Sequence, residues 1–105
     1  MKIKYNEQEL TVRKYQYSQN ESLYLGLYDE DNDAWPYEEE LYADITVNLP
    51  DSGCYPANFA YVDVNNFPEA VLIIEEYGLG KPTGRKAWNG FSCYPQYEFD
   101  LSKIN

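Results

Sequence analysis

The residues with the clearest chemical potential lie between positions 29 and 40, DEDNDAWPYEEE, where seven of twelve residues are Asp or Glu. Asp29, Asp31 and Asp33 would occupy positions one, three and five of a twelve-residue loop closed by Glu40, which is the spacing of an EF-hand calcium site. Alanine replaces the glycine that the sharp turn of such a loop needs, and the flanking residues predict strands rather than helices. We therefore expect no bound metal.

Two other interpretations of this segment remain. It is either a solvated connection between strands with no role beyond solubility, or a surface for recognition. In the second case the carboxylates imitate the charge of nucleic-acid phosphates, and aromatic residues anchor the contact with a partner. The candidate charge mimics are Asp29, Asp31, Asp33, Glu38, Glu39 and Glu40, and the candidate anchors are Trp35, Tyr37 and Tyr42.

A second candidate site is the glycine-rich segment GKPTGRK at residues 80–86, which holds three of the eight basic residues. It lacks the GxxxxGK[ST] spacing of a nucleotide-binding P-loop. A mobile surface loop is the ordinary explanation for such a segment. The functional alternative is an anion site that sequesters a nucleotide-like signal through Lys81, Thr83, Arg85 and Lys86.

The net charge of -10 predicts a partner with a basic surface. Direct binding to nucleic acid or to an anionic membrane is not expected, because basic side chains drive both. Histidine is absent, and no nucleophile or metalloprotease motif occurs. Glu38, Glu39 and Glu40 are consecutive, so neighbours point to opposite faces of a strand and cannot form a glycosidase pair. We expect a protein that is not an enzyme and uses no cofactor.

The cysteines and the hydropathy pattern indicate a cytoplasmic protein. Cys54 and Cys93 lack metal-site or redox spacing, and their spacing alone does not decide whether they pair. A small, buried, reduced side chain is the simplest interpretation of each. The N-terminus has no apolar signal segment, and no run of about 18 apolar residues occurs.

Alternation of apolar and polar residues predicts strands at 2–5, 10–17, 23–28, 41–48, 59–64 and 91–101. Proline at position 95 predicts that the last of these is an edge strand or is bent. The residues expected to face inward on the middle strands are Leu23, Leu25, Leu27, Leu41, Ala43, Ile45 and Val47. Those expected to face outward include Tyr24, Tyr28 and Tyr42. This outward set either forms cross-strand pairs or contacts a second copy in a homodimer.

One helix is predicted over residues 68–77, with Asn66 as its N-cap and Gly78 as its left-handed C-cap. Its expected apolar stripe includes Leu72 and Ile74. Residues 51–58 and 78–90 are rich in turn formers and predict irregular structure. We therefore expect a single α+β domain over residues 1–105, with one twisted, largely antiparallel sheet of five or six strands and one helix packed on one face.

The segments ITVNLPD (45–51), YVDVNNFPEAV (61–71), GLGKPTGR (78–85) and GFSCYPQYEFDL (90–101) resemble a family of small proteins known only as a domain of unknown function. The resemblance fades over residues 1–40. It implies an accessory protein of gut-bacterial prophages or mobile elements, and it transfers no catalytic residue. The leading hypothesis is thus a counter-defence inhibitor, similar to an anti-CRISPR protein, acting in the host cytoplasm. An anion-sequestering protein and a structural assembly module are the alternatives.

Overall fold

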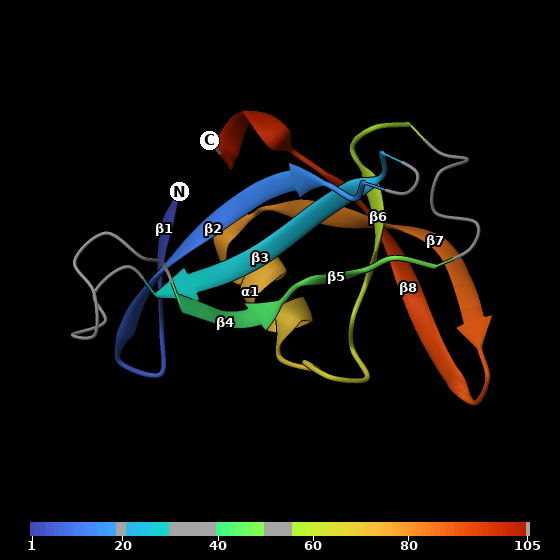
Figure 1. The fold of residues 1–105 in the computed structure, drawn as a ribbon, viewed down its shortest axis with the longest axis horizontal. Coiled ribbons are helices and arrows are strands. Elements are labelled where there is room, and N and C mark those ends of the chain that lie inside the picture. The colour runs from blue at the N-terminus through green and yellow to red at the C-terminus, as the bar shows by residue number, and fades with distance from the viewer. Residues whose placement is uncertain (19–20, 30–39, 50–55, 105) are drawn as a thin grey trace.

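The computed structural model describes residues 1–18, 21–29, 40–49 and 56–104, and it describes Glu40 by its backbone alone. These residues form two four-stranded antiparallel sheets, not one sheet of five or six strands, so the expected architecture was wrong in this respect (Figure 1). The first sheet contains, in spatial order, β1 (Lys2–Tyr5), β2 (Gln8–Gln16), β3 (Leu23–Asp29) and β4 (Glu40–Asp44). The second contains β5 (Thr46–Val47), β6 (Phe59–Val62), β8 (Ser92–Phe99) and β7 (Gly80–Asn89).

The chain passes from one sheet to the other at Ile45, in the middle of the run predicted as a single strand. The Ile45 N–H donates to the carbonyl of Leu25 at 2.9 Å, and its carbonyl accepts from the N–H of Asp63 at 2.9 Å. One residue thereby bonds to both sheets. The Thr46 hydroxyl accepts from the Leu25 N–H at 3.0 Å, in place of a backbone partner. Alternation continues through this point, so the sequence conceals the change of sheet.

A β-bulge in β4 places Leu41 and Tyr42 on the faces opposite to those predicted. Leu27 pairs with Ala43 but Tyr28 pairs with Leu41, which leaves Tyr42 as the extra residue. Leu41 therefore lies on the outer face and is 51% exposed, and the prediction that it faces inward was wrong. Tyr42 is turned to the opposite side, where its ring centroid lies 6.1 Å from that of Tyr5.

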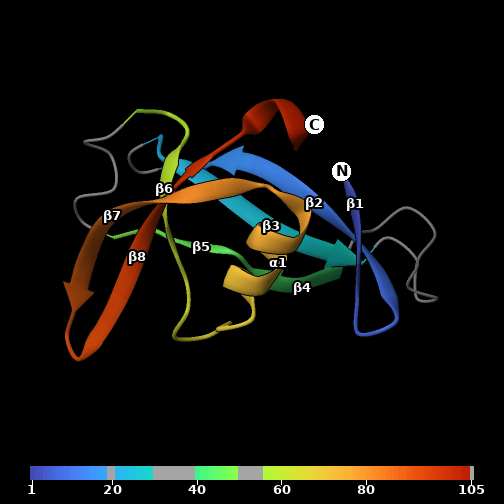
Figure 2. The ribbon, with the colours of Figure 1, turned by 180° about the vertical axis from the view of Figure 1, so that it is seen from behind.

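The main core lies between the sheets and α1 (Ala70–Tyr77), which crosses the inner side of the first sheet (Figure 2). The predicted inward residues Leu23, Leu25 and Leu27 are buried as expected. On α1 the buried residues are Ala70, Ile73 and Ile74, whereas Leu72 is 64% exposed, contrary to the predicted stripe. A smaller apolar cluster of Leu49, Tyr61 and Tyr94 forms apart from the main core.

Both ends of α1 are tied by specific contacts. Gly78 ends the helix at a φ of 62°, as predicted. The Tyr77 hydroxyl accepts from the Lys4 N–H at 2.8 Å, which attaches the helix to β1. The predicted N-cap Asn66 was wrong, since the helix begins at Ala70 without a side-chain cap. Asn66 instead donates its N–H to the carboxylate of buried Asp63 at 3.3 Å.

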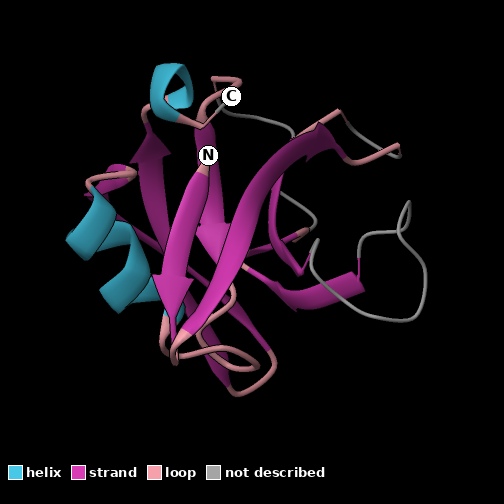
Figure 3. Cartoon of the chain, turned by 90° about the vertical axis from the view of Figure 1, so that its left-hand side faces the viewer, coloured by secondary structure: helices cyan, strands magenta, loops and turns pink. Residues whose placement is uncertain are grey.

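The segment expected to be irregular at 78–90 is mostly the ten-residue strand β7, so that prediction was wrong (Figure 1). Strands rather than helices make up most of the regular structure of the described residues (Figure 3). Gly84, with a φ of 88°, lies in the register shift of β7 and supplies a conformation that other residues rarely adopt. Strand β8 lies inside the sheet, so the edge-strand alternative expected from Pro95 was wrong. Its pairing with short β6 ends at Gln96, so the missing N–H of Pro95 interrupts no bond there.

Candidate binding surfaces

Four tyrosines gather on the outer side of the first sheet and form what we term the tyrosine face: Tyr15, Tyr17, Tyr24 and Tyr28. Antiparallel pairing of β2 and β3 sets Tyr15 opposite Tyr24 and Thr11 opposite Tyr28. The Tyr24 ring centroid lies 6.1 Å from that of Tyr15 in a stacked arrangement and 5.5 Å from that of Tyr17, edge to face. Tyr15 is 53% exposed. The face thus presents aromatic area already ordered by its own ring contacts.

A hydrogen-bonded group of two phenols and a carboxylate fixes the centre of this face. The Tyr24 hydroxyl lies 2.9 Å from that of Tyr28 and donates to Asp44 Oδ1 at 2.8 Å. Burial, together with these bonds, raises the pKa of Tyr24 above its ordinary value. The hydroxyl therefore remains a neutral donor and is unsuited to act as a base. Burial likewise raises the pKa of Tyr17, whose hydroxyl lies 3.1 Å from that of Thr46.

Gly26 creates the space in which the Tyr24 ring lies. A Cβ atom at position 26 would lie 2.8 Å from Tyr24 Cζ and 3.1 Å from Tyr28 Cε2. Gly26 is buried, and Asp44 is its partner on β4. The small residue lets the ring of Tyr24 fold back over β3 and reach the carboxylate across the ladder.

The acidic segment, residues 29–40, joins the sheet beside the tyrosine face. Asp29 pairs with Glu40, and Tyr28 pairs with Leu41, so the connection 30–39 departs from the end of the β3–β4 ladder. The Asp29 carboxylate accepts from Gln8 Nε2 at 2.6 Å. The other proposed mimics and anchors in this connection lie outside the described residues: Asp31, Asp33, Trp35, Tyr37, Glu38 and Glu39. Of the nine candidate residues, the described part of the chain brings Asp29, the Glu40 backbone and Tyr42 to one end of the sheet.

Tyr42 differs in position from the other two tyrosines predicted to face outward. Tyr24 and Tyr28 share the tyrosine face, whereas the bulge directs Tyr42 toward Tyr5, which itself contacts Phe67 of the main core. Tyr42 remains 40% exposed and lines a small hollow with Gln8, Asp29 and Leu41. Its use as an anchor would therefore involve the rim of the sheet and not its outer face.

The four basic-segment candidates lie along edge strand β7, not on a loop that could close around an anion. Lys81 Nζ lies 3.6 Å from Glu98 Oε2, and the Thr83 hydroxyl donates to Gln96 Oε1 at 2.8 Å. A surface hollow of about 580 Å³ at the start of the strand is lined by Lys81 but also by Glu98 and Asp100. These carboxylates disfavour a bound anion there.

A family model described as Domain of unknown function (DUF4313) matches residues 10–105. The chain belongs to this family. The match includes the four segments that carried the resemblance and extends further toward the N-terminus than they do. No curated protein and no solved structure matches the chain. Membership of the DUF4313 family therefore assigns neither an activity nor a source organism.

Two findings on this DUF4313 chain concern features considered from its sequence, a metal site and a membrane-spanning helix. Within the described ranges, no group of three His, Cys, Asp or Glu side chains could hold a metal ion. The calcium interpretation depended on residues beyond those ranges. Likewise, no helix among the described residues is long and apolar enough to cross a membrane. Cys93 is half-buried on β8 opposite Trp88, and Cys54 lies outside the described residues.

Sequence reasoning missed the most exposed aromatic residues of the described chain. Trp88 is 71% exposed, and Phe91 is fully exposed in the turn between β7 and β8. The alternation pattern placed Phe91 at the start of the strand predicted over 91–101 and not in a turn. A usable signal was present nonetheless, because residues 77–97 contain no Asp or Glu in a chain that has eighteen.

Proposed function

We propose that this DUF4313 protein is a non-enzymatic binding protein that occupies a basic surface on a partner protein. In its concrete form it is a counter-defence inhibitor, encoded by a phage or mobile element, that imitates nucleic acid and blocks a nuclease of the host. It acts in the host cytoplasm, and the anchoring surface is the tyrosine face together with the acidic segment beside it.

The observation that carries this proposal is the ordered Tyr24–Tyr28–Asp44 group on the outer face of the β3–β4 ladder, from whose Asp29–Glu40 end the acidic segment departs. Interface hot spots combine rigid aromatic area with nearby charge, and tyrosine supplies that area at low entropic cost. Here the rings are held by one another before any partner arrives, so binding requires little further ordering. The adjacent carboxylates supply steering toward a basic groove, which salt would weaken.

The anion-sequestering alternative has less support. Lys81 and Thr83 already contact β8 side chains, and their neighbours are spread along a strand. The assembly-module alternative is supported only by exposed aromatic area, which a partner protein would equally cover. The binding proposal uses both the charge distribution and the tyrosine face, so we favour it.

The decisive experiment measures DNA cleavage by a panel of guide-RNA-directed nucleases in the presence of the protein. The test variant reverses Asp31, Glu38 and Glu40 to Lys. The matched control reverses three other acids, Glu7, Glu75 and Glu76, which are exposed on the β1–β2 turn and α1 and give the same change in net charge.

We expect the test variant to lose inhibition while the control variant retains it, with both melting as the wild type does. Equal loss in both variants would mean that net charge alone acts, which contradicts a located surface. Retention of inhibition by the test variant would refute charge mimicry, and absence of inhibition across the panel would refute the concrete form.

A further inference from the structure

The β7–β8 hairpin extends beyond the strand that supports its base. β6 pairs with β8 only through Gln96–Glu98, so among the described residues the part of the hairpin from Lys86 to Pro95 pairs only with itself (Figure 1). Asn89 pairs with Ser92 around a two-residue turn of Gly90 and Phe91, in which Gly90 has a φ of 66°. The turn is therefore held away from the body of the protein by a regular ladder.

The end of this hairpin carries two large apolar side chains that nothing in the described chain covers. Phe91 is 103% exposed and Trp88 is 71% exposed, whereas Ala87 on the other face packs against the cluster containing Tyr94. We call Trp88 and Phe91 the aromatic tip. Large exposed aromatic residues are costly to leave in water, and two of them on one projection mark an interaction site.

The charge around the aromatic tip is opposite in sign to that of the whole protein. Residues 77–97 have no acid, and Arg85 and Lys86 are exposed on the same strand as Trp88. Lys81, further from the turn, is paired with Glu98. The end of β3 and the start of β4, between which the acidic connection runs, lie at the other end of the molecule in Figure 1, and the longest dimension of the molecule is 38 Å. At physiological ionic strength, charge is screened over about 8 Å, so a partner at the tip meets a locally basic surface.

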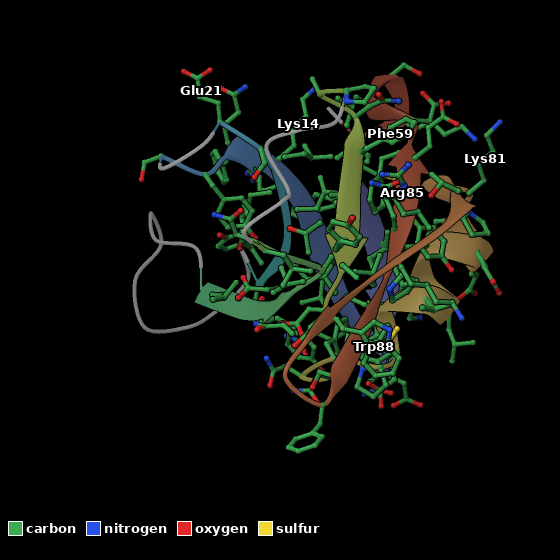
Figure 4. All side chains as sticks on the ribbon, turned by 90° about the vertical axis from the view of Figure 1, so that its right-hand side faces the viewer. Lys14, Glu21, Phe59, Lys81, Arg85 and Trp88 are labelled. Atoms are coloured by element: carbon green, nitrogen blue, oxygen red, sulfur yellow. The ribbon has the colours of Figure 1, made fainter. Side chains whose placement is uncertain are left out.

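The order of residues along the hairpin distinguishes among anionic partners. At about 3.3 Å per residue, Trp88 lies roughly 7 Å behind the turn and Lys86 roughly 13 Å behind it. Phe91 is outermost, and Figure 4 shows Trp88 nearer the turn than Arg85. A bilayer presents the same sequence of layers: acyl chains, then the interface that tryptophan prefers, then the phosphates that attract cations. Single-stranded nucleic acid is instead bound by grooves in which aromatic and basic residues lie side by side.

We infer that the aromatic tip is a peripheral membrane-binding site for anionic lipid surfaces, with Phe91 inserted, Trp88 at the interface and Arg85 and Lys86 beside the headgroups. Insertion to the depth of Trp88 agrees with the 5–10 Å over which apolar faces of interfacial elements are buried. The expectation that the protein does not bind membranes rested on its net negative charge alone. The end of this hairpin, in contrast, is locally positive.

The test uses the full chain with Trp35→Phe, which leaves Trp88 as the only tryptophan. Its emission is followed while vesicles of phosphatidylcholine with about one-third phosphatidylglycerol are added, with pure phosphatidylcholine vesicles as the comparison. Phe91→Ser should weaken partitioning about tenfold or more. Lys86→Glu should weaken it about fivefold or more. The matched controls are Leu72→Ser, 64% exposed on α1, and Lys14→Glu, exposed on β2 and remote from Trp88 in Figure 4.

A blue shift on anionic vesicles that is lost in Phe91→Ser and kept in Leu72→Ser supports the inference. No shift on anionic vesicles at low salt overturns it, as does a shift that Phe91→Ser and Lys86→Glu leave unchanged. A stronger response to oligothymidylate than to vesicles also overturns it and assigns the tip to nucleic acid. The reversal of Asp31, Glu38 and Glu40 should not weaken vesicle binding, so failure of the proposed function and failure of this inference are distinguishable.

Discussion

Replacing Gly26 with Ala should destabilise the protein because the tyrosine face is built around that residue. The added Cβ would meet the end of the Tyr24 ring, with Cζ at 2.8 Å, so the ring must move. Moving it breaks the hydrogen bonds that join Tyr24 to Tyr28 and to Asp44, and it disturbs the stacking with Tyr15.

The magnitude follows from these contacts. A neutral hydrogen bond contributes about 1 kcal/mol and one to a charged group about 1.5–3 kcal/mol, and the lower values apply to this partly exposed group. An aromatic pair adds about 0.5–1.5 kcal/mol. Alanine in a strand regains about 0.5–1 kcal/mol over glycine. The free energy of unfolding should therefore fall by about 2–3.5 kcal/mol.

Urea denaturation followed by circular dichroism measures this loss, and a double-mutant cycle identifies its cause. In a Tyr24→Ala background only the 3.1 Å contact with Tyr28 Cε2 remains, so Gly26→Ala should cost much less than it does in the wild type. The reasoning is refuted if Gly26→Ala costs the same in both backgrounds, because the loss would then arise from the backbone and not from the ring of Tyr24.

Three further outcomes are expected. Asp63→Ala should lower the free energy of unfolding by about 1 kcal/mol and Asn66→Ala by less, since the carboxylate of Asp63 holds the turn before α1; equal urea midpoints would contradict this. Gly80→Ala should cost about 1–3 kcal/mol, because its Cβ would lie 2.7 Å from the Glu98 carbonyl oxygen, and an unchanged midpoint would show that β7 can shift. Burial raises the pKa of Tyr24 above 10.0 in the folded state, so the unfolded chain loses its proton first. Stability is thus complete below about pH 10 and falls above it, and urea midpoints at about pH 8 and pH 11 should show a smaller fall in Tyr24→Phe.

Strands whose alternate apolar residues all face a single core were predictable from the sequence, as was the end of the helix. Leu23, Leu25 and Leu27 are buried, and Gly78 ends the helix at a positive φ. The α1 stripe differs from the prediction in that Leu72 is exposed and Ile73 is buried. The helix begins at Ala70 after a turn held by Asp63, two features that a capping pattern centred on Asn66 obscures.

The errors have a common physical origin in tertiary pairing. The change of sheet at Ile45 and the bulge at Tyr42 both preserve a plausible alternation, so periodicity cannot reveal them. The glycines and proline of residues 80–90 signal a loop only if no partner strand is available. In β7 the Gly84 bulge and the edge position accommodate them while the rest pairs with β8.

For the binding surfaces, the sequence showed where along the chain charge is concentrated but not which end of the molecule presents it. A net charge of -10 argues against any anionic partner only if that charge is evenly spread. Five of the eighteen acids lie between residues 30 and 39, in the connection that starts from one end of the β3–β4 ladder, while the acid-free end of the β7–β8 hairpin projects from the other end of the body. A separation of several screening lengths lets one small domain present two surfaces of opposite preference. The charge reversals and the aromatic-tip substitutions act at different ends, so each should impair its own partner and leave the other unaffected.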